Sequence, residues 1–269
     1  IVLVHEREKG TQFISCNELT KKIPKFYVYY MAKVQQFYID ILNIPKEKFR
    51  FFELNEKEKA FYNKYHFDME VDLDSIGWTE IGGVHYRTDH DLKGHQEISK
   101  QNLSIIDEET KQKFIPHVLE LSFGVDRNIQ TLLTFAYFHD EKRQNIVLKL
   151  QQQLAPIKAA IFPIVKQPEY EKLAEEITNN LKKEFNVVYD RSGSIGRRYA
   201  RNDEQGTPFC ITIDELSSKQ HDVTIRDRDT TQQIRVKIKK LKEIKRKLIN
   251  QEIKFERAGK EVVTRVKVK

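Results

Sequence analysis

Cysteine is scarce in this sequence, which contains only Cys16 and Cys210. Two cysteines provide neither a disulfide framework nor a zinc cluster, and they indicate a reducing, intracellular setting. No apolar run is long enough to span a bilayer, and no signal peptide is visible. We therefore expect a cytoplasmic protein without a membrane partner. The chain begins with Ile1 instead of Met, which is compatible with a missing upstream portion.

The composition is that of a folded protein with a substantial core. Hydrophobic residues make up 39% of the 269 residues and charged residues 32%, and this length accommodates one large domain or two ordinary ones. Basic residues exceed acidic ones, which gives a net charge of +7 and a pI of about 9.1. Such an excess fits a polyanionic partner such as RNA, although many basic proteins bind no nucleic acid.

The first half of the sequence is predicted to form an antiparallel sheet with helices packed on it. Residues 27–43 place apolar side chains at helical spacing, and the same spacing recurs after Gly124. Short runs rich in aromatic and β-branched residues, bounded by polar turns, are typical of strands. The strand-like runs are 49–54, 66–73, 77–86 and 117–122.

The second half has a different pattern, and the charged stretch 139–145 marks the change. Strand-like and helical segments alternate after it, which predicts a small α/β domain with a mixed five-stranded sheet. We thus expect an α+β chain with a first domain at 1–150, a second at 151–251, and a charged tail at 252–269 that is an edge strand or disordered. The expected strands of the second domain are 155–165, 185–190, 208–214, 222–228 and 233–238, and its expected helices are 168–184, 194–206 and 241–251.

The segment VLELSFGVDR, residues 118–127, carries polar groups inside an apolar, strand-like run. Alternate side chains of a strand share a face, so Glu120 and Ser122 are expected roughly 7 Å apart, where both could accept hydrogen bonds from an ammonium group. Arg127 falls in the first turn of the next helix, where a bound phosphate would meet backbone N–H groups and a guanidinium. A plain Glu–Arg salt bridge at a sheet edge is the alternative.

The segment GWTEIGGVHYRTDHDL, residues 77–92, is a second strand-like run with polar side chains. Alternation predicts that Trp78, Glu80 and Gly82 share one face. Two adjacent glycines in a strand indicate a bulge or the close approach of a ligand. The run ends in a charged cluster that forms either part of a site or a solvated loop, namely Arg87, Asp89 and Asp91.

Several blocks of the chain resemble, in the same order, those of glycyl-tRNA synthetases of the archaeal and eukaryotic type. GWTEIGGVHYRTDHDLKGH (77–95) resembles a GW-x-E segment of that family, and PHVLELSFGVDR (116–127) resembles its third class II motif. The likeness extends from about Tyr38 to Asn250. Three further blocks are similar to the anticodon-binding domain of the family, LAPIKAAIFPIV (154–165), SGSIGRRYARNDEQGTPFCITID (192–214) and TIRDRDTTQQIRV (224–236).

The resemblance implies a class II ligase. Such an enzyme activates glycine with ATP and Mg²⁺ to glycyl-adenylate, transfers glycine to tRNA(Gly), and forms a homodimer when complete. The implied fold is part of the class II antiparallel-sheet catalytic core, followed by an α/β anticodon-binding domain.

The resemblance also implies roles for individual residues. Glu120, Ser122 and Gly124 would hold glycine, and Arg127 and Glu120 would take part in catalysis. The residues implied in ATP binding are Glu80, Ile81, Gly124, Val125, Asp126 and Arg127. The residues implied in tRNA binding are Ser194, Arg197, Arg198 and Arg226, with an exposed helix face as the alternative for the arginines at 197–201. The direct Mg²⁺ ligands stay open.

Some features of the family have no counterpart here. The first class II motif, which builds the dimer interface, and the second, whose arginine binds the α-phosphate, are not found, and residues 1–36 resemble the tail of an insertion. We therefore expect these residues alone to be inactive in adenylation. His85 and Tyr86 replace a small residue followed by Asp, Asn or His. Two alternatives stay open: a non-catalytic nucleic-acid-binding relative of the DNA polymerase accessory type, and a fragment that needs a partner carrying the other motifs.

Overall fold

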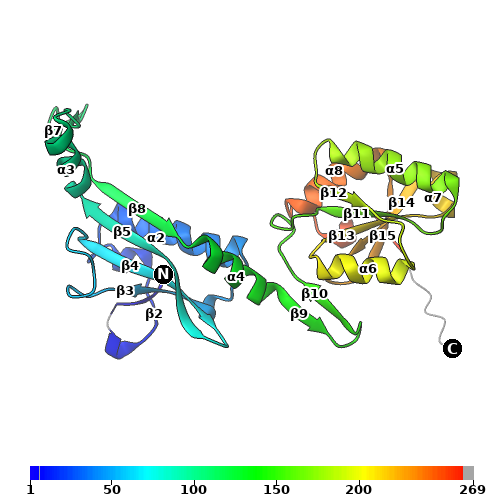
Figure 1. Ribbon diagram of the computed structural model, residues 1–269, viewed down its shortest axis with the longest axis horizontal. Helices are drawn as coiled ribbons and strands as arrows, with labels where there is room; N and C mark the ends of the chain where they lie inside the picture. Colours follow the sequence, from blue (N-terminus) through cyan, green and yellow to red (C-terminus); the bar gives the residue numbers. More distant parts are fainter. Residues whose placement is uncertain (6, 263–269) are drawn as a thin grey trace. The chain divides into compact units, whose positions relative to one another are not determined.

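The computed structural model describes residues 1–5 and 7–262, and its chain forms two compact units (Figure 1). Unit 1 comprises Ile1–Phe135 and unit 2 comprises Ala136–Lys269. The boundary expected at residue 150 lies inside unit 2, because the charged stretch 139–145 belongs to a hairpin of that unit. None of the described helices could cross a membrane, since each falls short in length or in apolar character.

The described strands of unit 1 form a six-stranded sheet in the order β2-β1-β3-β4-β5-β8, and β6 and β7 form a separate ribbon. Neighbouring strands of the large sheet pair antiparallel, except that β1 and β3 pair parallel. The strands are β1 Val2–Val4, β2 Gln12–Phe13, β3 Phe49–Glu53, β4 Tyr65–Leu73, β5 Gly77–Thr88, β6 Ile105–Ile106, β7 Lys113–Phe114 and β8 Val118–Phe123. The α-helices are α1 Cys16–Leu19, α2 Lys25–Gln36, α3 His90–Ser99 and α4 Val125–Ala136, and short turns of other helix types are η1 Arg7–Lys9, η2 Phe37–Ile41 and η3 Lys46–Lys48.

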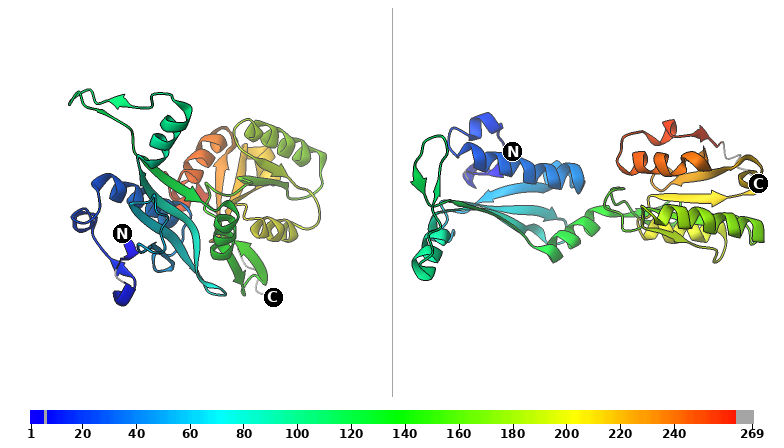
Figure 2. Two further views of the ribbon diagram at one scale, coloured as in Figure 1. Left: turned by 60° about the vertical axis from the view of Figure 1, so that its left-hand side comes forward. Right: turned by 90° about the horizontal axis from the view of Figure 1, so that it is seen from above.

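Helix α2 lies against one face of this sheet (Figure 2). Tyr27, Met31 and Val34, at helical spacing, are buried, and the Tyr27 hydroxyl donates to the Val84 carbonyl of β5 at 2.6 Å. Apolar residues that alternate along β3, β4 and β5 form the other side of this core. Helix α2 and the buried strand β1 thus both belong to this core.

The opposite face of the sheet, which we call the polar face, carries most of the polar side chains of its strands. A bulge in β5 at Ile81 shifts the register between β4 and β5, so Glu80 pairs with Glu70 while Gly82 pairs with Met69. Met69 belongs to the core, so Gly82 faces the core and does not share a face with Glu80, contrary to the prediction from alternation. A Cβ on Gly82 would lie 2.3 Å from the Ser122 carbonyl oxygen, so only glycine fits there.

The large sheet of unit 2 has six described strands, in the order β12-β11-β13-β14-β15-β16, one more than the five predicted. Strands β11, β12 and β13 pair parallel and the others antiparallel, which confirms a mixed sheet, and β9 and β10 form the hairpin. The strands are β9 Tyr137–Asp140, β10 Asn145–Leu148, β11 Ala159–Pro163, β12 Val187–Tyr189, β13 Phe209–Ile213, β14 Asp222–Asp227, β15 Gln233–Lys237 and β16 Lys260–Glu261. The helices are α5 Pro168–Lys182, α6 Ile195–Glu204, α7 Glu215–Gln220, α8 Ile238–Ile249 and the 3-10 turn η4 Phe255–Arg257.

Helices cover both faces of the unit 2 sheet (Figure 1). The larger core lies beneath α5 and α8, and a smaller core on the other face joins Phe162 and Cys210 to Tyr199 of α6. Part of the expected tail, 252–262, belongs to the fold, because β16 pairs with β15. The remaining tail residues, 263–269, lie outside the described residues.

Candidate functional site

The polar face of unit 1 brings together the residues that the sequence suggested for an amine site. Strand β8 pairs with β5 so that Ser122 lies opposite Gly83 and Glu120 lies opposite His85. Leu121 and Leu119 pair with the core residues Val84 and Tyr86, so Glu120 and Ser122 point to the other face. The prediction that these two side chains share one face is confirmed by this register.

Glu120 is already in contact with a cation. Its carboxylate accepts a hydrogen bond from Arg87 at 2.7 Å, and Arg87 also forms a two-pronged ion pair with Asp91 of α3. The cluster at 87–91 is therefore an ordered ion pair at the end of β5 and the start of α3. The Glu–Arg salt bridge considered as the alternative forms on the edge strand β8, but Glu120 pairs with Arg87 and not with Arg127. Arg87 contacts the Oε2 atom of Glu120, and the Glu120 side chain is 39% exposed, so its carboxylate can also accept from a second cation.

Arg127 and its neighbours line a pocket where β5 and β8 meet the start of α4. The Arg127 guanidinium donates to the Glu80 carbonyl at 2.9 Å and lies 3.3 Å from the Glu80 carboxylate. Both side chains are about half exposed, so this ion pair is weak and open to exchange with a ligand. The pocket has a volume of about 390 Å³, and its lining contains all six predicted ATP-binding residues together with Gly82, Ser122 and Phe123.

Asn128, which the sequence did not single out, fixes the start of α4 against the sheet. Its amide donates to the Ile81 carbonyl at 2.8 Å, and its oxygen accepts from the buried Tyr38 hydroxyl at 2.6 Å. Gly124 donates its backbone N–H to the same Ile81 carbonyl at 2.9 Å. These bonds hold the first turn of α4, and with it Arg127, beside the bulge of β5.

In unit 2 the four predicted tRNA contacts have different environments. Ser194 caps α6 by accepting from the Arg197 backbone N–H, and the Arg197 side chain is exposed. Arg198 is only 3% exposed and donates to the carbonyl of Pro163 at 2.7 Å. Burial lowers the pKa of Arg198 from its ordinary value. A direct contact of Arg198 with tRNA is therefore inconsistent with the structure.

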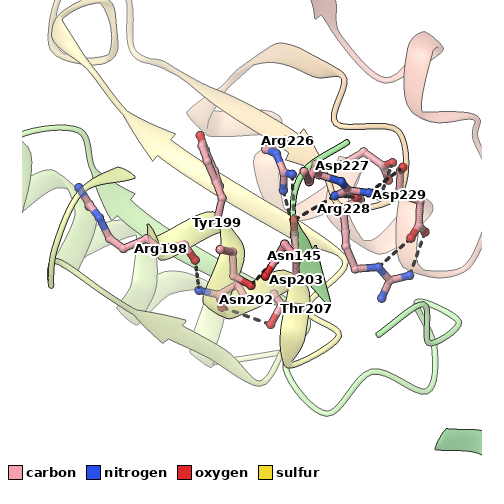
Figure 3. Close-up of polar contacts among 12 residues, drawn as sticks. Asn145, Arg198, Tyr199, Asn202, Asp203, Thr207, Arg226, Asp227, Arg228 and Asp229 are labelled. Carbon is pink, nitrogen blue, oxygen red and sulfur yellow. Dashed lines mark hydrogen bonds and ion pairs between the residues drawn. The ribbon is translucent and has the colours of Figure 1, made fainter. Parts of the chain in front are cut away.

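Arg226 is likewise buried, and it belongs to a charge network that the sequence did not reveal (Figure 3). Its guanidinium donates two bonds to the carboxylate of Asp203, at 2.8 and 3.0 Å, and Arg143 of the β9–β10 turn donates to the same carboxylate at 3.0 Å. Burial alone would lower the pKa of Arg226, but the hydrogen bonds to Asp203 outweigh it and raise the pKa. The prediction that Arg226 contacts tRNA is corrected to a structural role.

Arg228 extends this network toward the hairpin connection. It is 2% exposed and donates to the carbonyls of Gly206 and Leu150, both at 2.8 Å, and to the carboxylate of Asp229. The network thus ties α6, β14 and the segment after β10 together. Arginine and aspartate at these positions look like surface residues in the sequence, because most of their partners lie far away along the chain.

Comparison with known proteins gives the relatives of the chain. Residues 158–248 match the anticodon binding domain family. Glycine–tRNA ligase from Clostridium acetobutylicum is 40% identical over 220 residues, covering 81% of this chain and 47% of that protein. The chain is homologous to glycine–tRNA ligases. Glycine–tRNA ligase from Caldanaerobacter subterraneus subsp. tengcongensis is also 40% identical, covering 82% of this chain and 48% of that protein.

The chain therefore spans about half the length of the curated relatives it matches. A crystal structure of prolyl-tRNA synthetase from Cryptosporidium parvum, complexed with L-proline and AMP, shares the fold with a TM-score of 0.59. It is 19% identical and is matched over 90% of this chain and 49% of that chain. This likeness confirms the predicted fold of the synthetase type, and the ligase homologues confirm the resemblance drawn from the sequence blocks.

Proposed function

We propose that the chain carries the glycine and ATP sites of a glycine–tRNA ligase in unit 1 and a tRNA(Gly)-binding surface in unit 2. The observation that carries this proposal is the pocket at the start of α4, where Ser122 and Arg127 line one cavity beside Glu120 on the polar face. An ammonium site next to a phosphate site is what amino-acid adenylation requires. The homology to glycine–tRNA ligases supports the choice of glycine.

In the proposed reaction the glycine carboxylate attacks the α-phosphorus of ATP, and pyrophosphate leaves in line. Glu120 and Ser122 hold the glycine ammonium through charge-assisted hydrogen bonds, which orient its carboxylate. The Arg127 guanidinium gives up its ion pair with Glu80, binds the polyphosphate of ATP and neutralises charge on the leaving group. Glycine has no side chain, so its ammonium carries much of the recognition, and larger amino acids are rejected by lack of space.

Magnesium enters this proposal as part of the MgATP substrate. No cluster of three or more His, Cys, Asp or Glu side chains suited to a metal ion occurs in the part of the chain that the structure describes. The homodimer of the complete enzyme, its cytoplasmic location, and the inactivity of these residues alone in adenylation remain part of the same proposal. The relatives reported above are ligases, which disfavours a non-catalytic nucleic-acid-binding role.

Replacing Glu120 by alanine is expected to weaken glycine binding by about 10- to 100-fold, because one charge-assisted hydrogen bond contributes roughly 1.5–3 kcal/mol. Binding of MgATP should change by less than about twofold. Calorimetric titration of the 269-residue chain with glycine and with MgATP measures both affinities without requiring turnover. Glu109→Ala, which removes an exposed carboxylate near the β6–β7 ribbon, is the matched control. An equal loss of both affinities would refute the ammonium assignment and the proposed function with it.

Replacing the exposed Arg197 by glutamate is expected to weaken tRNA(Gly) binding and to flatten its salt dependence. Each lost phosphate contact should reduce the slope of log K against log salt by about one. The measurement is filter binding across a salt series. Lys182→Glu makes the same charge change on α5, on the opposite face of the unit 2 sheet, and should leave binding nearly unchanged. If both variants lose the same affinity, general charge and not the α6 surface binds the tRNA.

A further inference from the structure

Asn63 joins two histidines beside the proposed ammonium site. It is 4% exposed, and its Nδ2 atom lies 3.3 Å from Nδ1 of His66 and 3.4 Å from Nδ1 of His85. The two imidazole rings lie 4.1 Å apart between their centroids. A primary amide has two hydrogens, so Asn63 can donate one to each histidine.

The contact on the far side of the His66 ring fixes the tautomer of that histidine. Nε2 of His66 lies 3.0 Å from the Asp68 carboxylate, so it carries the proton and Nδ1 is free to accept from Asn63. In the reversed amide orientation the oxygen would face both Nδ1 atoms. His66 would then need protons on both nitrogens and would be an imidazolium whose ring centroid lies 4.1 Å from that of His85, whereas the donating orientation leaves both rings neutral. Asn63 therefore donates to both rings, although among the described residues its Oδ1 has no partner.

This network determines the direction of the bond to Ser122. Because Nδ1 of His85 accepts from Asn63, its proton is on Nε2, which lies 3.1 Å from the Ser122 hydroxyl oxygen and donates to it. The Ser122 hydroxyl hydrogen then points to the Gly83 carbonyl at 3.5 Å. One lone pair of Ser122 is left, on the face that also bears Glu120.

We propose that Asn63 and His85 are positioning residues for a substrate α-ammonium: Asn63 holds His85 in the neutral Nε2–H tautomer, and His85 turns Ser122 into an acceptor. This inference rests on the proposed function for its ligand and deepens it by naming the groups that prepare the amine site. The sequence showed that His85 departs from the family pattern, but it assigned no role to this residue.

The arrangement makes glycine binding sensitive to acid. A second proton on His85 would place an N–H against the Asn63 N–H and would put a cation where the ammonium binds. Burial, followed by the charge of His66, lowers the pKa of His85 from its ordinary value, whereas the carboxylates of Glu120 and Asp68 oppose that shift and Arg87 adds to it. His85 is therefore neutral at pH 7, and glycine affinity is lost as the pH falls through the His85 pKa.

The test uses the 269-residue chain labelled with [¹⁵N]histidine. Long-range ¹H–¹⁵N spectra should show the Nε2–H tautomer for His66 and His85 at pH 7.5. Titration with glycine between pH 5 and 8 should show an affinity that falls by up to about tenfold per pH unit below the His85 pKa, in proportion to the neutral fraction. Asn63→Asp, whose carboxylate accepts where the amide donates, should raise the pKa of His85 and weaken glycine binding at pH 7. Asn180→Asp, on the exposed face of α5, is the control.

The outcomes separate the two proposals. An Nδ1–H tautomer on His85, or a glycine affinity that does not change while His85 titrates, overturns the positioning role and leaves the ammonium site itself intact. No binding of glycine at any pH, with both tautomers as expected, overturns the ammonium site, the proposed function and the role of His85 together. The wild-type spectra decide the tautomers even if the Asn63 variant does not fold.

Discussion

Replacing Asp203 by alanine is expected to lower the free energy of unfolding of unit 2 by about 3–5 kcal/mol, because removal of one partner leaves an uncompensated buried charge. Asp203 is 1% exposed and accepts hydrogen bonds from Arg226 and Arg143. Without this carboxylate, the guanidinium of Arg226, itself 6% exposed, has no counter-ion in the core. A loss of this size approaches the total stability of many domains.

The single tryptophan of the chain allows the two units to be observed separately. Trp78 belongs to β5 of unit 1, so urea unfolding followed by its fluorescence reports on unit 1, whereas far-ultraviolet circular dichroism reports on both units. In the Asp203→Ala variant, unit 2 should unfold at a lower urea concentration than in the wild type, as measured by circular dichroism. The urea midpoint measured by Trp78 fluorescence should stay unchanged. Glu204→Ala, an exposed neighbour on α6, is the control. A circular dichroism midpoint equal to that of the wild type would show that the network contributes no net stability.

Replacing Lys245 by methionine is expected to stabilise unit 2 by up to roughly 3–4 kcal/mol at pH 7. Lys245 is 2% exposed, and among the described residues its ammonium has no hydrogen-bond partner and lies 4.4 Å from the ring centre of Phe185. Burial, and next the charge of Lys158, lowers the pKa of Lys245 to about 7, and Glu184 partly opposes this shift. Methionine keeps the volume and removes the charge.

The same substitution should change how stability depends on pH. In the unfolded chain Lys245 keeps its proton up to its ordinary pKa of 10.5, whereas in the folded chain its pKa is about 7. Between these values the unfolded state holds more protons, so wild-type stability rises with pH from about 7 to about 10.5. Urea unfolding at several pH values should show this rise in the wild type and in the exposed control Lys240→Met, but not in Lys245→Met. A parallel rise in all three proteins would contradict the assignment.

Local periodicity predicted the long strands of both large sheets and the helices α2, α4, α5, α6 and α8. The alternation in VLELS placed Glu120 and Ser122 on one face, and Ser194 and Gly206 marked the limits of α6, as the structure has them. Such features depend on neighbours along the chain, so a single sequence contains them. The hairpin at 137–148 was missed because its charged turn resembles a linker, although Arg143 in that turn enters the core network.

Burial was harder to predict than secondary structure. The apolar spacing of α4 predicted the helix, yet Val125, Ile129 and Leu133 on it are exposed, while Arg198, Arg226 and Lys245 are buried. The bulge at Ile81 similarly reversed the face of Gly82. A pattern gives the direction of a side chain relative to its own backbone, but not what packs against that direction.

The sequence by itself determined the fold class, the homology to glycine–tRNA ligases, and the residues that line the pocket at Gly124, because those residues are close together in two short segments. Only the tertiary structure decided which cations are available to a ligand. Asp203 is the counter-ion of Arg226 and is shared with Arg143, and the hydrogen bond from Asn63 sets the tautomer of His85. In each case the partners are so far apart along the chain that the sequence carries no local signal of the contact. The free energy of a buried charge or a ring proton is set by the groups that surround it in space, and folding alone brings those groups together.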